Sequence, residues 1–156
     1  MDHWFQVQHL DIDKLLAEWR WLCPGQVRLV ARTVFGDLFL IGESGEVFRL
    51  DVSIGRLEKI ADSEAQFVKL ADIPDNRDTW FALNEEESFA AKGLVANPEQ
   101  CIGFDVPLVF AEGGHVRKPY VVDIYENVSF LGDLNRQIAE VPDGGKIELR
   151  VGPNPS

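Results

Sequence analysis

The sequence is short of basic residues, and this shortage excludes several kinds of partner. Only 15 of its 156 residues are lysine or arginine, against 26 aspartates and glutamates, so the formal net charge is -11. A field of that sign repels phosphate backbones and anionic lipid headgroups, which argues against nucleic acid and membrane surfaces as partners. It attracts basic proteins, although acidity is also an ordinary means to solubility.

Cysteines and long apolar runs are also scarce. Cys23 and Cys101 are the only cysteines and lie far apart, which favours two buried thiols in a reducing compartment over a disulfide framework or a zinc site. No run of 18 apolar residues is present to span a bilayer. The first residues lack the basic segment and cleavage site of a signal peptide. We therefore expect a cytoplasmic protein.

The sequence lacks the usual signatures of catalysis. His3, His9 and His115 do not have the spacing of metal ligands. Ser44 lies in GESGE, which superficially resembles a nucleophile elbow but is one residue short and joins two predicted strands, so we favour a hairpin turn. Carboxylates are too abundant for any pair to stand out as an acid and base. The sequence thus predicts no catalytic residue, no metal site and no cofactor, and a protein that is not an enzyme.

One glycine-containing loop leaves two interpretations open. The stretch AEGGHVRKP, residues 111–119, has Gly113 and Gly114 followed by Arg117 and Lys118. Such a loop could hold an anion, but phosphate-binding loops lead into a helix, and none clearly follows here. It is either a binding loop or a plain connection.

The residues that are present suffice for one folded domain. Apolar residues make up 46% of the chain, including four tryptophans and ten phenylalanines. A chain of this length typically buries about 70% of the surface that its unfolded form exposes. We expect a single domain over residues 1–156, with a frayed tail at about 152–156.

Alternation of apolar and polar residues predicts a sheet in the first half of the chain. The four predicted strands are QVRLVARTV (26–34), LFLIG (38–42), EVFRLDV (46–52) and RLEKIA (56–61). The three turns between them are short, and each contains glycine. Neighbouring strands joined in this way form an antiparallel meander.

Apolar residues at helical spacing occur in the sequence both before and after this predicted sheet. Residues 11–22 predict a helix whose apolar face is made of Leu15, Leu16, Trp19 and Leu22. After the sheet we expect a helix that begins at Ser63 with a capping box, two short helices within 71–93, and a helix over 126–141. Residues 101–110 and 119–125 fit strands or buried extended segments, and Pro107 argues against a central strand. The fold class is therefore α+β, with an antiparallel meander packed by helices.

The densest acidic feature lies in the predicted short helices. Three consecutive glutamates follow three aspartates, and two aromatic residues lie between them. Acids near a helix start favour the helix dipole, so this can be a solvated first turn. Acids beside aromatics are also common in protein contact sites. On that second interpretation, the partner-binding residues are Asp72, Asp75, Asp78, Trp80, Phe81, Glu85, Glu86 and Glu87.

Several stretches resemble the SUKH superfamily of Smi/Knr-like proteins. They are TVFGDLF (33–39), GEVFRLD (45–51), Gly55, SEAQFVKL (63–70), CIGFDVPLVFAEGG (101–114) and FLGDLNRQIAEVPDGGKI (130–147). The nearest likeness is to the branch related to the C-terminal domain of type VI secretion immunity proteins. These motifs belong to hairpins, glycine turns and a core, and none is a catalytic signature.

The resemblance implies an α+β fold with a twisted antiparallel sheet packed by helices. It implies a binding role, because many members are thought to neutralise a bacterial toxin, often a nuclease. An acidic inhibitor can occupy the basic site of a nuclease by matching the charge of its substrate. We therefore expect an immunity protein or antitoxin whose partner is a basic protein toxin. The alternative is a regulatory or scaffold module of the same fold with no toxin partner.

Overall fold

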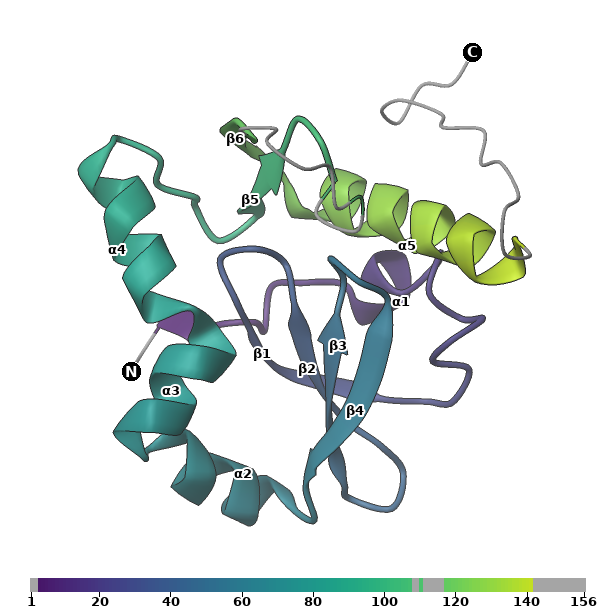
Figure 1. Cartoon of the computed structure of the whole chain (residues 1–156). Helices are drawn as coiled ribbons and strands as arrows, with labels where there is room; N and C mark the ends of the chain where they lie inside the picture. Colours follow the sequence, from purple (N-terminus) through teal and green to yellow (C-terminus); the bar gives the residue numbers. More distant parts are fainter. Residues whose placement is uncertain (1–2, 108–109, 111–116, 142–156) are drawn as a thin grey trace.

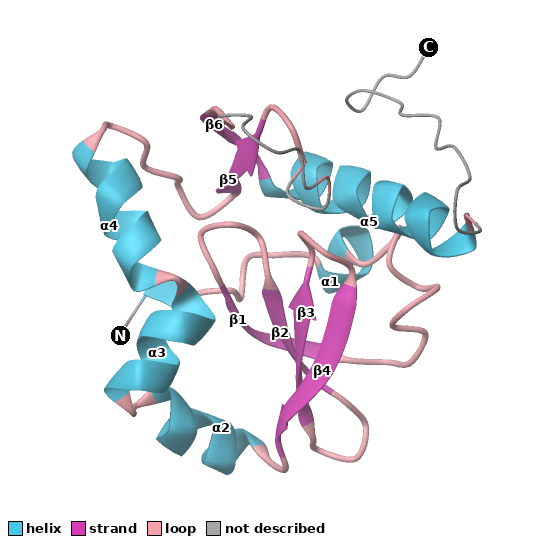
Figure 2. Cartoon of the chain, in the orientation of Figure 1, coloured by secondary structure: helices cyan, strands magenta, loops and turns pink. Residues whose placement is uncertain are grey.

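The first half of the chain folds as a four-stranded meander (Figure 2). The computed structural model describes residues 3–107, 110 and 117–141. Its first sheet has antiparallel strands in chain order: β1 (Arg28–Arg32), β2 (Leu38–Ile41), β3 (Val47–Asp51) and β4 (Arg56–Ala61). Each of these strands lies within a predicted stretch, so the prediction of the meander is confirmed. The GESGE stretch is the β2–β3 turn, where the N–H of Gly45 donates to the carbonyl of Gly42.

Helices cover both faces of this sheet (Figure 1). On one side, α5 (Ile124–Glu140) and the short α1 (Ile12–Leu15) lie together, and on the other a column of three helices passes along the sheet. The column consists of α2 (Glu64–Ala71), α3 (Pro74–Phe81) and α4 (Leu83–Ala91), and the short helix η1 (His3–Phe5) lies against it. No helix in the described part of the chain is long and apolar enough to cross a bilayer.

The sheet separates two apolar clusters because β2 is buried on both faces. Leu38 and Leu40 point into the cluster shared with α1 and α5. Phe39 and Ile41, one residue out of phase, point into the cluster shared with α2 and α3. Strand side chains alternate between faces, so one short apolar strand supplies both cores.

A second hairpin is tied to the meander by hydrogen bonds. Strands β5 (Gln100–Phe104) and β6 (Pro119–Asp123) form a two-stranded antiparallel sheet. The N–H of Ile102 donates to the carbonyl of Val34 over 2.8 Å. The buried guanidinium of Arg32 donates to the carbonyls of Pro98 and Gln100 over 3.1 and 2.6 Å. The two sheets and their helices thus form a single-domain α+β fold.

The first predicted helix is wrong in its extent. Only Ile12–Leu15 is helical, and turns continue to Leu22. In this segment the backbone N–H of Trp19 donates to the backbone carbonyl of Leu16, three residues earlier, over 2.9 Å. This bond is typical of a turn and not of an α-helix. The Trp19 side chain is fully buried, and its Nε1 donates to the Val128 carbonyl of α5 over 2.8 Å. Packing of this indole against α5 decides the local backbone, while the predicted apolar face still points into the core.

The predictions of a capped helix from Ser63 and of two short helices within 71–93 are confirmed. The Oγ of Ser63 accepts from the N–H of Gln66 at the start of α2, and Pro74 is the first residue of α3. Between α3 and α4, Ala82 has a φ of 51°, a left-handed conformation that allows a sharp turn. Gly93, with a φ of 85°, follows the end of α4. The tail at 152–156 lies outside the described residues.

Candidate protein-binding surface

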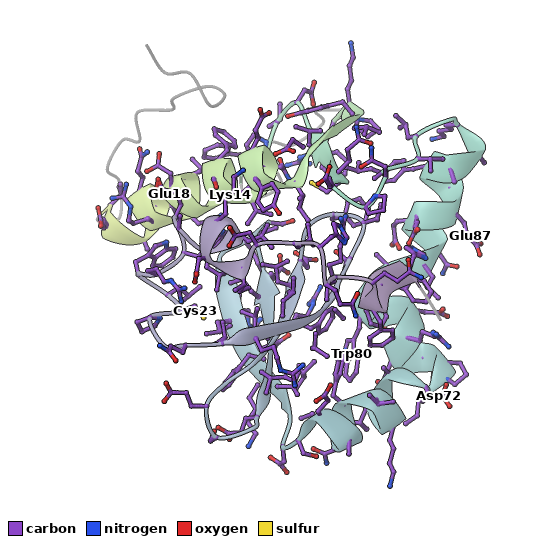
Figure 3. The ribbon with its side chains drawn as sticks, turned by 180° about the vertical axis from the view of Figure 1, so that it is seen from behind. Lys14, Glu18, Cys23, Asp72, Trp80 and Glu87 are labelled. Carbon is purple, nitrogen blue, oxygen red and sulfur yellow. The ribbon has the colours of Figure 1, made fainter. Side chains whose placement is uncertain are left out.

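Exposed carboxylates occur along the helix column. Figure 3 shows Asp72 and Glu87 pointing away from the sheet. Asp75, Asp78 and Glu85 are also exposed. We call these five residues the acidic face. Five of the eight predicted partner-binding residues therefore lie at the surface of the column.

The two predicted aromatic residues of this surface serve the core. Phe81 is fully buried and packs on Trp4 and Phe39 at ring-centroid distances of 5.0 and 5.2 Å. Trp80 is half-buried, points toward the sheet in Figure 3, and stacks on Phe67 at 5.7 Å. The interpretation of Phe81 as a contact residue is wrong, because a partner cannot reach its ring. Both aromatics instead fix the column against the sheet.

Glu86 differs from its neighbours because it faces the N-terminal segment. One carboxylate oxygen accepts from Trp4 Nε1 at 3.0 Å, and the other lies 2.7 Å from His3 Nε2. The guanidinium of Arg77 lies 5.2 Å from the centre of the Trp4 ring. Glu86 therefore anchors η1 to α4, and we correct its assignment from the binding surface to the structure of the column.

The column carries a strong excess of one charge. Between residues 62 and 91 there are eight acidic and two basic residues. Of the two cations, Arg77 is half-buried against Trp4, and Lys69 is exposed on α2. The acidic face therefore presents a negative potential that repels anions and favours encounter with basic groups.

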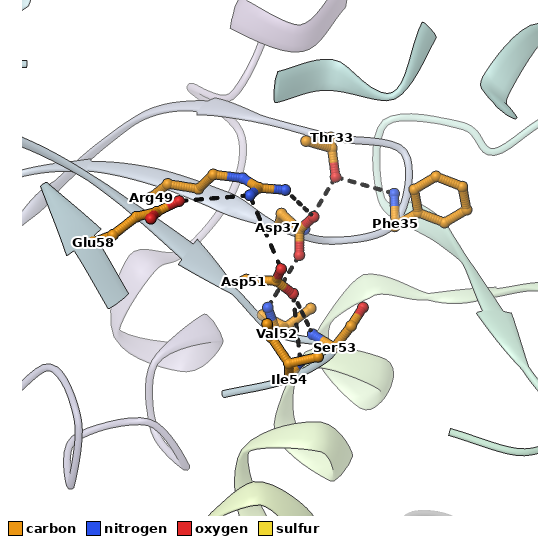
Figure 4. Close-up of polar contacts among 9 residues, drawn as sticks. All are labelled: Thr33, Phe35, Asp37, Arg49, Asp51, Val52, Ser53, Ile54 and Glu58. Atoms are coloured by element: carbon orange, nitrogen blue, oxygen red, sulfur yellow. Dashed lines mark hydrogen bonds and ion pairs between the residues drawn. The ribbon is translucent and has the colours of Figure 1, made fainter. Parts of the chain in front are cut away.

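A second group of carboxylates, which the sequence did not single out, surrounds Arg49 in the sheet, and one of them is buried (Figure 4). Asp37 is 6% exposed; one carboxylate oxygen accepts from the N–H of Val52 at 3.0 Å, and the other lies 3.4 Å from Arg49. The same guanidinium lies 3.9 Å from Asp51 and 3.8 Å from Glu58. A single cation is thus shared by three carboxylates.

The pKa of Asp37 is raised to about 7, chiefly because burial disfavours the charged carboxylate. The negative charge of Asp51 adds to the rise, and Arg49 and the Val52 N–H oppose it. The Nε of Arg49 is buried and has no hydrogen-bond partner among the described residues. The group joins the β1–β2 turn to the end of β3, and we assign it a structural role. Its signals in the sequence are Asp37, which follows Gly36 between two predicted strands, and Arg49, which lies within a predicted strand.

The thiols of Cys23 and Cys101 are buried in the apolar cluster that the sheet shares with α1 and α5. Burial raises the pKa of Cys101 to about 12 and also raises that of Cys23. A thiol with a raised pKa is a poor nucleophile at neutral pH, so neither cysteine is suited to covalent catalysis.

The sequence raised three other possibilities: a serine nucleophile, a metal site and an anion-binding loop. Ser44 donates from its hydroxyl to Glu46 at 2.9 Å within the β2–β3 turn. In the described part of the chain, no three His, Cys, Asp or Glu side chains converge as a metal site requires. Gly113, Gly114 and His115 of the loop with two interpretations lie outside the described residues. Comparison with known proteins found no family model, no curated protein and no solved structure that matches this chain.

Proposed function

We propose that this chain is a non-catalytic binding protein that neutralises a bacterial toxin by direct contact, as an immunity protein or antitoxin does. The observation that carries the proposal is the acidic face, where four carboxylates lie exposed on α3 and α4 and a fifth, Asp72, lies just before α3. The neighbouring cation Arg77 lies 3.9 Å from Asp72. The sequence resemblance to the SUKH superfamily supports the same role.

The charge of the acidic face indicates what kind of toxin fits. A nuclease holds a polyanion and therefore carries basic groups around its active site. Carboxylates fixed on helices can pair with those groups and exclude the nucleic acid. The partner that we propose is accordingly a basic protein toxin, met in the cytosol.

Growth rescue is the direct test of this function. Candidate toxins encoded next to this gene are expressed in a bacterial host with and without this chain. We expect at least one toxin to stop growth alone and to be tolerated when the chain is present. If none is neutralised and affinity purification returns host proteins, the regulatory or scaffold alternative replaces the proposal.

A matched pair of variants tests the surface itself. Asp78→Asn, Glu85→Gln and Glu87→Gln together remove three charges from the acidic face. Glu18→Gln, Glu43→Gln and Glu99→Gln together remove three exposed charges elsewhere. We expect toxin affinity, measured by calorimetry, to fall at least ~10-fold for the first variant, since several charge pairs are lost. Equal losses for both variants would show that net charge, and not the acidic face, directs binding.

A further inference from the structure

An apolar groove of about 800 Å³ lies beside β1. Its walls come from three parts of the chain: Val7 and Leu10 of the N-terminal segment, Leu29 and Val30 of β1, and Val68 of α2. Val68 is 51% exposed, although it is a large apolar residue. An apolar hollow on a chain of this charge is a feature that commonly marks a contact site.

The strand that borders this groove has an open edge. In the sheet order, β1 pairs with β2 alone. Among the described residues, none outside the sheet exchanges a backbone hydrogen bond with Arg28, Leu29 or Val30. An antiparallel edge strand presents outward N–H and C=O groups that can pair with a further strand.

The two edges of the sheet differ in the number of exposed or half-buried charged residues that they carry. Strand β4 carries Arg56, Glu58 and Lys59, and charges on an edge strand oppose pairing with another chain. On β1 the one exposed charge is Arg28, whose guanidinium is paired with Glu64 of α2 at 2.8 Å. Its charge is therefore already balanced at the rim of the groove.

We propose that the groove receives an extended segment of the protein partner, which adds to the sheet as a strand beside β1. Apolar side chains of that segment enter the groove, and lysine or arginine side chains beside them are favoured by the excess of acids on the neighbouring helix column. Strand addition combines backbone pairing with side-chain pockets in this way. The basic character of the segment rests on the proposed function.

A synthetic probe tests this site without the toxin. The probe is the capped peptide acetyl-Lys-Val-Lys-Val-Lys-Val-Lys-amide, which alternates apolar and basic residues as the groove requires. We expect slowed amide hydrogen exchange at residues 28–31 and saturable binding by NMR titration. A peptide N-methylated at both its lysines and its valines cannot donate backbone hydrogen bonds to β1 in either register. That peptide and one with glutamate in place of lysine are both expected to bind at least ~10-fold more weakly.

Two protein variants with equally exposed positions complete the test. Val68→Lys adds a like charge in the groove, whereas Ile54→Lys makes the same change at a turn residue that is 49% exposed and outside the groove. We expect Val68→Lys to weaken the probe at least ~10-fold and Ile54→Lys to leave it unchanged.

Several results would overturn the inference. Equal binding of the N-methylated peptide would show attraction by charge alone. A dimer in analytical ultracentrifugation that Val68→Lys abolishes would assign the groove to a second copy of the chain. Because the probe is not a toxin, failed growth rescue with intact probe binding rejects only the toxin role. Rescue without probe binding rejects only the groove.

Discussion

At the scale of single residues, the buried carboxyl of Asp37 links the fold to pH. Its pKa is raised to about 7 in the folded chain, from 3.8 without the fold, chiefly because burial disfavours the charged form. The native state therefore holds a proton that the unfolded chain has released between about pH 4 and 7. The corresponding stability is complete below pH 4 and is lost as the pH rises through 7.

Replacing Asp37 with asparagine should flatten this pH response. Asp37→Asn keeps an oxygen for the Val52 N–H but has no proton to exchange. As the pH rises from 5 to 6, we expect the free energy of unfolding of the wild type to fall relative to that of the variant. The fall should be up to ~1.4 kcal/mol per pH unit, the value for one proton. Urea titrations at several pH values measure this difference.

The control is Asp13→Asn, which neutralises a highly exposed carboxylate. It should retain the wild-type dependence on pH. If Asp37→Asn also retains it, the protonated carboxyl is not the source of the response.

At the scale of elements, α5 contains a glycine where the chain needs close contact. A Cβ on Gly132 would lie 2.7 Å from the carbonyl oxygen of Glu18 and 2.9 Å from Trp19 Nε1. Glycine in a helix interior costs about 1 kcal/mol relative to alanine. Glycine is nevertheless required here, because the turns before β1 lie directly on α5 and leave no room for a Cβ.

Gly132→Ala should therefore destabilise the protein despite its better helix propensity. We expect the free energy of unfolding to fall by ~1–3 kcal/mol, the usual range for overpacking, as measured by urea unfolding followed by circular dichroism. Ser129→Ala, on the same helix and half-buried, is the control and should be neutral or slightly stabilising. A stabilised Gly132→Ala would contradict the close approach of the two segments.

The sequence predicts elements well where local signals agree with the tertiary structure. The strands of the meander follow from alternation and from turns such as that at Gly45, and α2 follows from the Ser63 cap. The helix over 11–22 was overestimated because Trp19 bonds to α5, a contact 109 residues away that no local pattern contains.

The candidate site was only partly predictable for a related reason. The acids of α3 and α4 are visible in the sequence, but α3 has eight residues and little contrast between its faces. Spacing alone could not show that Trp80 and Phe81 turn toward the sheet. The groove beside β1 was missed because its wall combines segments near residues 7, 29 and 68, which only the fold brings together.

At the scale of the whole molecule, the net charge of -11 sets how salt affects stability. Like charges on a compact surface repel one another more than they do in the expanded chain. Added salt screens this repulsion, and the exposed ion pairs that salt also weakens contribute little each.

We therefore expect sodium chloride to stabilise the protein. Raising its concentration from 20 to 300 mM should increase the melting temperature by ~2–4 °C, equivalent to ~1 kcal/mol for a chain of this size. The variant with Asp78→Asn, Glu85→Gln and Glu87→Gln should gain less, because part of the repulsion is already gone. Scanning calorimetry measures both, and a melting temperature that falls with salt would contradict the expectation.

The bond from Trp19 to Val128 also bears on how the chain folds during synthesis. This bond joins the N-terminal segment, in the apolar cluster shared with α1 and α5, to α5 itself. Helix α5 begins only at Ile124, late in the chain. The ribosome therefore releases the meander well before the helix that covers one of its faces. Until then Leu38 and Leu40 lack their cover, so the nascent chain has to stay unaggregated with an apolar sheet face open to water.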